Sequence, residues 1–161
     1  MPSRSDQGRA QGRATGGRGW LLDTNVISEL RKGTRCNRAV AGWAERVPPI
    51  ACFLSGVTVA EIVFGIEGVD DPGFRAELGA WLRDGVRAWF GPRILEVDEP
   101  VLLAWRRLVT EGQKARYTYS QPDALIAATA QVHGLAVATR NIEDFFQAGV
   151  PILNPWEAGA G

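Results

Sequence analysis

The sequence predicts a three-layer α/β/α sandwich with a mostly parallel central sheet, and three observations lead to this fold class. Short apolar runs alternate along the chain with longer stretches of helical periodicity, which implies crossover connections between parallel strands. The first apolar run, at 20–23, is typical of a strand buried on both faces. The chain has 161 residues, 45% of them hydrophobic, so it can form one domain with a substantial core.

The first half of the chain is expected to form two strands and three helices. The strands are residues 20–23 and 50–55, and the helices are residues 24–33, 37–47 and 58–68. Gly33 and Gly68 follow two of these helices and act as C-terminal stops. Pro48 and Pro49 end the helix at 37–47, because proline cannot continue a helix.

The second half of the chain repeats the alternation of strands and helices. The strands are residues 93–98, 135–139 and 150–154, and the helices are residues 73–90, 99–115 and 123–134. The helices at 73–90 and 99–115 carry large apolar side chains on one side, as expected for amphipathic helices against a sheet. Gly134 ends the helix at 123–134.

The N-terminal 19 residues differ in composition from the rest. They contain five glycines and four arginines but one aspartate and almost no large apolar side chain. Such a segment cannot bury enough surface to offset its ordering entropy, so residues 1–19 are predicted to be a disordered basic tail. A misassigned start codon would explain the same composition. Residues 158–161 are expected to be a flexible C-terminus, which leaves one domain at 20–157.

Charge and cysteine content exclude several classes of protein. Eighteen basic and 18 acidic residues give a formal net charge of zero, so no global field favours nucleic acid or a membrane. There is no apolar signal segment and no run of 18 apolar residues, so we expect a cytoplasmic protein without a membrane partner. Cys36 and Cys52 lack a Cys/His partner cluster and are expected to be reduced thiols with packing roles.

Acidic and amide side chains are predicted to lie together at the edge of the sheet formed by the carboxyl ends of the strands. Asp23 closes the first strand, Glu61 lies one turn into the helix after the second, Asp123 begins the helix before the strand at 135–139, and Asn141 and Asp144 follow that strand. Ligands collect at this edge in parallel sheets. Clustered carboxylates repel one another, and a hard cation such as Mg²⁺ or Mn²⁺ removes that repulsion by taking carboxylate and water oxygens.

Each acid also has a simpler interpretation as a helix cap. Thr58-x-x-Glu61 and Ser120-x-x-Asp123 both fit the capping box. Asp23 could cap the next helix, and Asp144 could favour the N-terminus of a short helix. His133, the sole histidine, lies before Gly134 and is interpreted as a favourable C-terminal charge.

Four segments carry a resemblance to a known family. LLDTNVISEL, VTVAEIVFGI, DALIAATAQVHGLAVATRNIEDF and the closing NPWE resemble the PIN-domain ribonucleases, specifically the VapC toxins of bacterial toxin–antitoxin pairs, with a leaning to the FitB-like branch. The resemblance covers residues 20–157. It implies a Mg²⁺-dependent endoribonuclease, with Mn²⁺ as a substitute, that is usually a homodimer, is blocked by a cognate antitoxin, and leaves a 5′-phosphate and a 3′-hydroxyl.

The resemblance also assigns residues. It implies that Asp23 and Asp123 bind the metal and that Glu61 completes the acidic cluster. The fourth acid of the family is open here, because the first position after ATR is Asn141 and an acid comes only at Asp144.

Several further side chains are candidates for contact with RNA. Arg31, Lys32, Arg35, Arg116 and Arg140 could form a basic rim, since Arg and Lys bind phosphate. Arg140 is the first choice, and Thr24, Asn25, Ser28 and Thr139 could orient phosphate or metal-bound water, or could make only local helix and turn bonds. Two rival functions remain open: a Mg²⁺-dependent phosphohydrolase of small molecules, and a non-catalytic binding module with the same fold.

Overall fold

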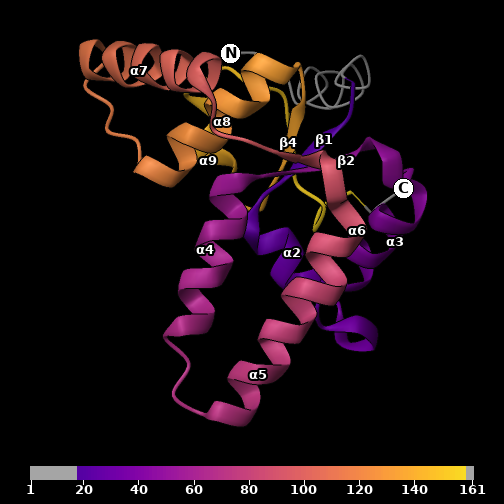
Figure 1. Cartoon of the computed structure of the whole chain (residues 1–161). Helices are drawn as coiled ribbons and strands as arrows, with labels where there is room; N and C mark the ends of the chain where they lie inside the picture. The colour runs from indigo at the N-terminus through magenta and orange to yellow at the C-terminus, as the bar shows by residue number, and fades with distance from the viewer. Residues whose placement is uncertain (1–17, 159–161) are drawn as a thin grey trace.

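A computed structural model describes residues 18–158, and its centre is a parallel sheet of five strands. The strands are β1 (Trp20–Leu22), β2 (Cys52–Ser55), β3 (Ile94–Leu95), β4 (Ala136–Ala138) and β5 (Ile152–Leu153), in the order β3-β2-β1-β4-β5. Every pair of neighbouring strands is parallel. The predicted three-layer sandwich is confirmed, with helices on both faces of the sheet (Figure 1).

One face of the sheet carries the helices of the first half of the chain. They are α2 (Thr24–Leu30), α3 (Arg38–Arg46), α4 (Gly56–Glu67), α5 (Pro72–Ala80), the π-helical segment η4 (Trp81–Arg87) and α6 (Ala88–Phe90), with short 3₁₀ segments η2 (Gly33–Arg35), η3 (Pro49–Ala51) and η5 (Gly91–Arg93). The other face carries α7 (Glu99–Lys114), α8 (Gln121–His133) and α9 (Ile142–Phe146). The C-terminal end of α4 and the N-terminal end of α5, which follow each other in the chain, project well beyond the sheet (Figure 1).

Alternation along the strands builds two separate cores. Leu22 and Ala138 belong to a cluster with α2, α3, α4 and η4 side chains, whereas Leu21 and Val137 belong to a cluster with α8 and α9 side chains. Successive side chains of a strand point to opposite faces, so each short strand contributes to both cores. Both faces are therefore covered, as a parallel sheet requires.

Several element boundaries differ from the predicted ones. The predicted helix 24–33 ends at Leu30, because Gly33 has a φ of 58° and starts a 3₁₀ turn. The predicted strand 93–98 pairs only at Ile94 and Leu95, because Asp98 leaves the sheet to cap α7 through a 3.2 Å bond from the Val101 N–H. The predicted helix 73–90 is continuous in outline but contains the π-helical turn of η4.

The N-terminal edge of the domain starts slightly earlier than predicted. Gly19 is buried, and its carbonyl accepts a 3.1 Å hydrogen bond from the Ala136 N–H. Its φ is 155°, and a Cβ there would collide with the Ala51 carbonyl oxygen, so only glycine fits. The rest of the predicted tail, residues 1–17, and residues 159–161 lie outside the described residues. Among residues 18–158, no helix is long and apolar enough to cross a membrane.

Candidate active site

Asp23 lies where β1 ends and α2 begins. Its backbone is extended, and its Oδ1 accepts a 2.8 Å hydrogen bond from the Thr24 N–H, so the predicted cap role is confirmed. Only 5% of Asp23 is exposed, although a carboxylate is costly to bury. Asp23 is therefore a cap that also presents a second oxygen at the sheet edge.

That second oxygen is held by neighbours from β4 and α2. Oδ2 of Asp23 accepts hydrogen bonds from the Thr139 hydroxyl (2.8 Å) and from the Asn25 amide (3.2 Å). The Asn25 carbonyl oxygen in turn accepts from the Arg140 N–H at 3.3 Å. Thr139 is fully buried, and its hydroxyl orients Asp23 from a distant part of the chain. The local turn bond that the sequence left open is the one that the same hydroxyl oxygen accepts from the Asn141 N–H at 3.0 Å. Four predicted residues around Asp23 thus form one hydrogen-bonded network.

Asp123 lies in the first turn of α8. Ser120 caps this helix: its hydroxyl accepts from the Asp123 N–H at 3.3 Å and donates to Oδ2 of Asp123 at 2.6 Å. The capping interpretation is confirmed here as well, except that the carboxylate contacts the serine hydroxyl rather than its backbone N–H. Asp123 also lines the same cavity as Asp23, so capping and site membership coexist.

The predicted capping box at Thr58 and Glu61 is wrong. The structure starts α4 earlier, at Gly56, and the cap is Ser55, whose hydroxyl accepts from the Val57 N–H at 3.1 Å. Thr58 is buried inside the helix and Glu61 is exposed in its second turn. Glu61 is therefore free of a capping role, and its side chain lines the acidic cavity.

The acidic cavity gathers most of the predicted site at the carboxyl ends of the strands. Its volume is about 330 Å³, and it is lined by Asp23, Thr24, Asn25, Ser28, Glu61, Pro122, Asp123, Ile126 and Asn141. Burial raises the pKa of Asp23, against the hydrogen bonds from Thr139 and Thr24, and the charges of Asp123 and Asp144 raise it further. Burial also raises the pKa of Asp123, opposed by Ser120 and reinforced by Asp144.

Asn141 and Asp144 reach this cavity in different ways. Asn141 lines it directly, and its backbone N–H donates to the Thr139 hydroxyl at 3.0 Å. Asp144 lies in the first turn of α9, does not line the cavity, and acts on Asp23 and Asp123 through its charge. The identity of the fourth site residue therefore stays a prediction.

The donor set fits a hard divalent cation. Burial, and to a smaller extent repulsion from neighbouring acids, raises the pKa of Asp23 and of Asp123, so a cation between the two carboxylates would favour their charged forms. Within residues 18–158, no three acidic, histidine or cysteine side chains lie close enough to form a ready cage. Mg²⁺ is usually held by one or two carboxylates and several waters, so Asp23 and Asp123 are the residues that would hold such an ion.

Three members of the predicted basic rim contact other side chains of the protein. Lys32 forms an ion pair of 2.6 Å with Glu29, and the Arg31 guanidinium lies 5.9 Å from the ring centroids of Phe74 and Trp81. The Arg140 guanidinium lies 5.3 Å from the ring of Trp156, beside the network of Asp23. Among the five candidates, Arg140 has a hydrogen bond to a residue of the acidic cavity, because its backbone N–H donates to Asn25.

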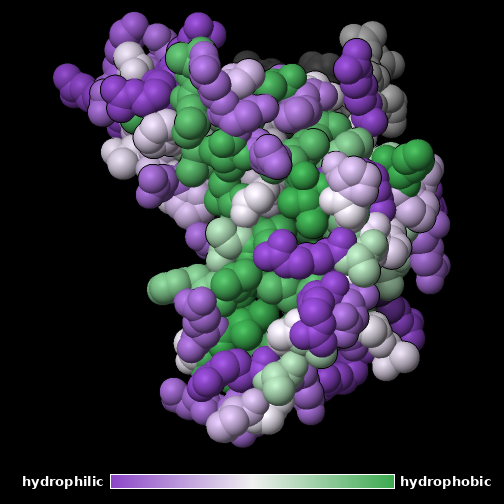
Figure 2. Space-filling model, in the orientation of Figure 1, coloured by the Kyte–Doolittle hydropathy of each residue, from purple (hydrophilic) through white to green (hydrophobic). Residues whose placement is uncertain are grey.

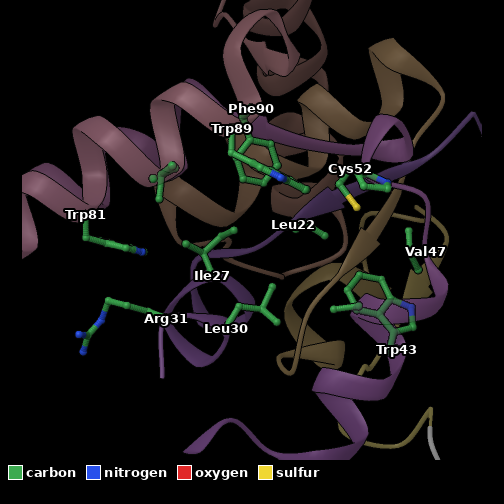
Figure 3. A pocket seen from close by; sticks show the side chains of 14 residues that line it. Leu22, Ile27, Leu30, Arg31, Trp43, Val47, Cys52, Trp81, Trp89 and Phe90 are labelled. Carbon is green, nitrogen blue, oxygen red and sulfur yellow. The ribbon is translucent and has the colours of Figure 1, made fainter. Parts of the chain in front are cut away.

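A second cavity, the apolar groove, was missed by sequence reasoning. Its volume is about 350 Å³, and it lies between α2, α3, η4 and α6 (Figure 3). Its lining is almost wholly apolar: Leu22, Ile27, Leu30, Arg31, Trp43, Ala44, Val47, Pro49, Cys52, Trp81, Gly85, Val86, Trp89 and Phe90. These side chains have the helical spacing of a core, so the sequence carried no signal that a hollow separates them.

Known proteins resemble this chain over nearly all of its described length. The PIN domain family matches residues 20–150. VapC ribonuclease Y4jK of Sinorhizobium fredii is 36% identical over 137 residues, which cover 85% of this chain and 97% of that protein. Toxin FitB of Neisseria gonorrhoeae is 35% identical over 136 residues, which cover 84% and 97% of the two chains.

Solved structures agree with these matches. The crystal structure of FitAcB from Neisseria gonorrhoeae superposes with a TM-score of 0.80 at 35% identity, over 86% of this chain and 99% of that one. A toxin–antitoxin complex from Klebsiella pneumoniae superposes with a TM-score of 0.61 at 27% identity, over 86% and 99% of the chains. The chain therefore belongs to the PIN-domain family, and its resemblance to the VapC-type toxins of the FitB-like branch is confirmed.

Proposed function

We propose that this protein is a divalent-metal-dependent endoribonuclease and the toxin of a toxin–antitoxin pair. The observation that carries the proposal is the acidic cavity, in which Asp23 and Asp123 come together at the carboxyl ends of parallel strands. The relatives named as a VapC ribonuclease and as toxin FitB support the substrate class and the biological role. Such a role places the protein in the cytoplasm.

The chain supplies orientation and charge for phosphodiester hydrolysis. A bound Mg²⁺ or Mn²⁺ would lower the pKa of its water and stabilise the leaving oxygen. Asp23 would hold the ion through an oxygen fixed by Thr139 and Asn25, and Asp123 through a carboxylate fixed by Ser120. Glu61, which is exposed in the same cavity, can accept the proton of the attacking water on its carboxylate.

Cleavage assays separate this proposal from its rivals. The parent is incubated with a mixed RNA and with mononucleotides, each with Mg²⁺, with Mn²⁺ and with EDTA. Metal-dependent cutting of RNA alone supports the nuclease, whereas phosphate release from nucleotides supports a small-molecule phosphohydrolase. Calorimetry with Mn²⁺ tests the binding module, because a domain without a metal site shows no heat that depends on Asp23.

The antitoxin is the partner proposed for the apolar groove. Three tryptophans, Trp43, Trp81 and Trp89, line a hollow between helices, and grooves of this kind accept the apolar face of an amphipathic helix (Figure 3). The similar toxin–antitoxin complex from Klebsiella pneumoniae supports a partner of this class.

A homodimer is proposed from the exposed surface of α4. Phe64 is 78% exposed, and it borders a shallow hollow of about 540 Å³ with Val59, Val63 and Ile94. Hydrophobic residues gather over the region between α4 and α5 in the space-filling view (Figure 2). Light scattering of the parent and of Phe64→Glu tests this: the variant should be a monomer if α4 forms the interface.

A further inference from the structure

The apolar groove has a single charged side chain, which lies at one of its ends. Of the 14 described residues that line the groove, Arg31 alone carries a charge. The Arg31 guanidinium lies 5.9 Å from the ring centroids of both Phe74 and Trp81. Its nitrogens point away from the Ile27 side chain, and Trp43 lies at the opposite end of the groove (Figure 3). Arg31 therefore presents a positive charge at the edge of an apolar surface.

A second arginine beside the groove has its hydrogen-bond donors satisfied by the protein. The Arg93 guanidinium lies 4.6 Å from the ring centroid of Trp89. It donates hydrogen bonds to three backbone carbonyls, those of Pro49, Cys52 and Trp89, of which the bond to Cys52 measures 2.7 Å. These bonds fix the position of Trp89, which is 50% exposed. The groove thus offers a partner an aromatic side chain that is already held in place.

Arg31, in contrast, has no anionic partner in the described part of the chain. Among residues 18–158, no ion pair includes Arg31. The acid of its neighbouring helix α2, Glu29, pairs with Lys32 at 2.6 Å, and the acid of η4, Asp84, pairs with Arg83 at 2.9 Å. Arg31 is also exposed. Its guanidinium is therefore free to bind an acid from another molecule.

A wholly apolar partner would match this end of the groove poorly. A segment that covers the groove also removes water from Arg31, and a charge that loses water without gaining a partner costs free energy. A guanidinium over an aromatic ring can still present its N–H edge to a carboxylate, in a pair of two parallel hydrogen bonds. An RNA strand would bring acceptors too, but the rest of the lining is apolar, which suits a peptide rather than a phosphate backbone.

We propose that the helix that docks in the apolar groove has an aspartate or glutamate at the edge of its apolar face, and that this acid pairs with Arg31. The inference rests on the proposed docking of an antitoxin in the groove and adds the charge that the docked segment must have. Many amphipathic helices have apolar faces, so a single charge pair would select among them. Arg31 is thereby a residue that determines partner specificity.

The first experiment selects peptides for the groove without assuming a partner sequence. A phage library of random peptides of about 16 residues, or about four helical turns, is selected on the full chain and counter-selected on Trp89→Ala. The counter-selection retains peptides that need the groove. Peptides recovered on the parent should have an acidic residue at a fixed spacing from two large apolar residues. The same selection on Arg31→Glu should replace that acid by lysine or arginine.

The second experiment is a double-mutant cycle with one recovered peptide. The peptide is synthesised with its acid and with the corresponding amide, and both forms are titrated against the parent and Arg31→Gln by fluorescence anisotropy. Either change alone should weaken binding about 5- to 10-fold, because an ion pair at the edge of an interface keeps part of its water. Both changes together should weaken binding no more than one of them does.

Arg107→Gln is the matched control. Arg107 is an exposed arginine of α7, on the other face of the sheet, so this variant should bind both peptides as the parent does. The melting temperatures of all variants should equal that of the parent, because both arginines are exposed. The change of acid to amide in the peptide tests the pair on the unaltered protein.

Four results would overturn the inference. Recovered peptides that need Trp89 but share no acidic position would leave the groove as a docking site without the charge pair. Additive losses in the cycle would show that the acid binds elsewhere. A larger loss of affinity for labelled RNA in EDTA than for the peptide in Arg31→Gln would assign the guanidinium to the substrate. A library that yields no Trp89-dependent peptide would overturn the proposed docking of a helix in the groove, and the inference with it.

Discussion

The acidic cavity and the apolar groove have similar volumes, about 330 and 350 Å³, but opposite linings. They share one helix: α2 gives Thr24, Asn25 and Ser28 to the acidic cavity, whereas Ile27, Leu30 and the residue after the helix, Arg31, line the groove. In the acidic cavity, carboxylates repel one another, and a bound cation would reduce that repulsion. In the apolar groove, apolar side chains are exposed to water, and a bound partner would cover them. One short helix thus separates the proposed chemistry from the proposed partner.

The largest expected effect is on the acidic cavity. Asp123→Asn should lower RNA cleavage by about 100-fold or more, because the cation supplies several kcal/mol of charge stabilisation. The Ser120 hydroxyl can still donate to the new amide oxygen, so the fold should survive. Cleavage rates and melts in Mg²⁺ measure this. Mg²⁺ should raise the melting temperature of the parent only, and retained metal-dependent cleavage would leave Asp123 as a cap alone.

Asp23→Asn tests the same cavity, but it also changes the hydrogen bonds around position 23. An amide at position 23 would place an N–H₂ group where Oδ2 now accepts from both Thr139 and Asn25. Part of any loss would then come from a broken buried network. The two cavities are best compared through Asp123.

The groove should respond to the loss of an aromatic anchor. Trp89→Ala should weaken the complex with the antitoxin by about 30-fold, the effect of a 2 kcal/mol hot spot, and leave RNA cleavage by the free protein unchanged. Trp89 is 50% exposed, so its removal should cost the fold little. Leu103→Ala, on α7 and 49% exposed, is the control. Titration of the antitoxin against cleavage measures the affinity, and equal inhibition of all three proteins would move the docking site elsewhere.

A smaller effect is expected from the fourth acidic position. Asp144→Asn should reduce cleavage about 10-fold, as for residues that act on a metal site from outside its direct ligands, and high Mn²⁺ should restore much of it. Asn141→Ala should lose less, because it removes no charge. A titration of both variants against Mn²⁺ decides the matter: a dead Asn141→Ala beside an unaffected Asp144→Asn would reverse the assignment.

Metal-free stability should depend on pH through the same acids. Burial raises the pKa of Asp123 in the folded protein, so the stability that its protonated form allows is lost as pH rises through that value. In EDTA at pH 7, Asp123→Asn should melt slightly higher than the parent. At about pH 3.5, below the ordinary aspartate pKa, that advantage should vanish. An advantage of the same size at both pH values would exclude ionisation as its cause.

The smallest effect concerns the floor of the groove. Gly85 lies within η4, and a Cβ there would sit 3.4 Å from the Trp81 ring. Gly85→Ala should raise the free energy of unfolding by about 0.5–1 kcal/mol, because glycine is unfavourable inside a helix. Urea unfolding measures the change, and cleavage should stay within twofold. A destabilised protein would mean that Trp81 cannot shift.

Most of the acidic cavity could be predicted from the sequence, because strand ends and helix starts fix where Asp23 and Asp123 go. The start of α4 was predicted wrongly at Thr58, because Ser55, three residues earlier, is the residue that caps the helix. The groove was hidden because Trp81 and Trp89 have the spacing of buried residues.

The position of β1 in the middle of the sheet affects how the protein is made. β1 pairs with β4, and Oδ2 of Asp23 meets the Thr139 hydroxyl across 116 positions of sequence. Contacts so distant form late, and a growing chain folds only the part that has left the ribosome. A chain whose synthesis stops before Thr139 lacks both the neighbour of β1 and the donor that orients Asp23. Interrupted translation therefore releases fragments without the assembled acidic edge, so the proposed cleavage activity would require a polypeptide that extends at least to Thr139.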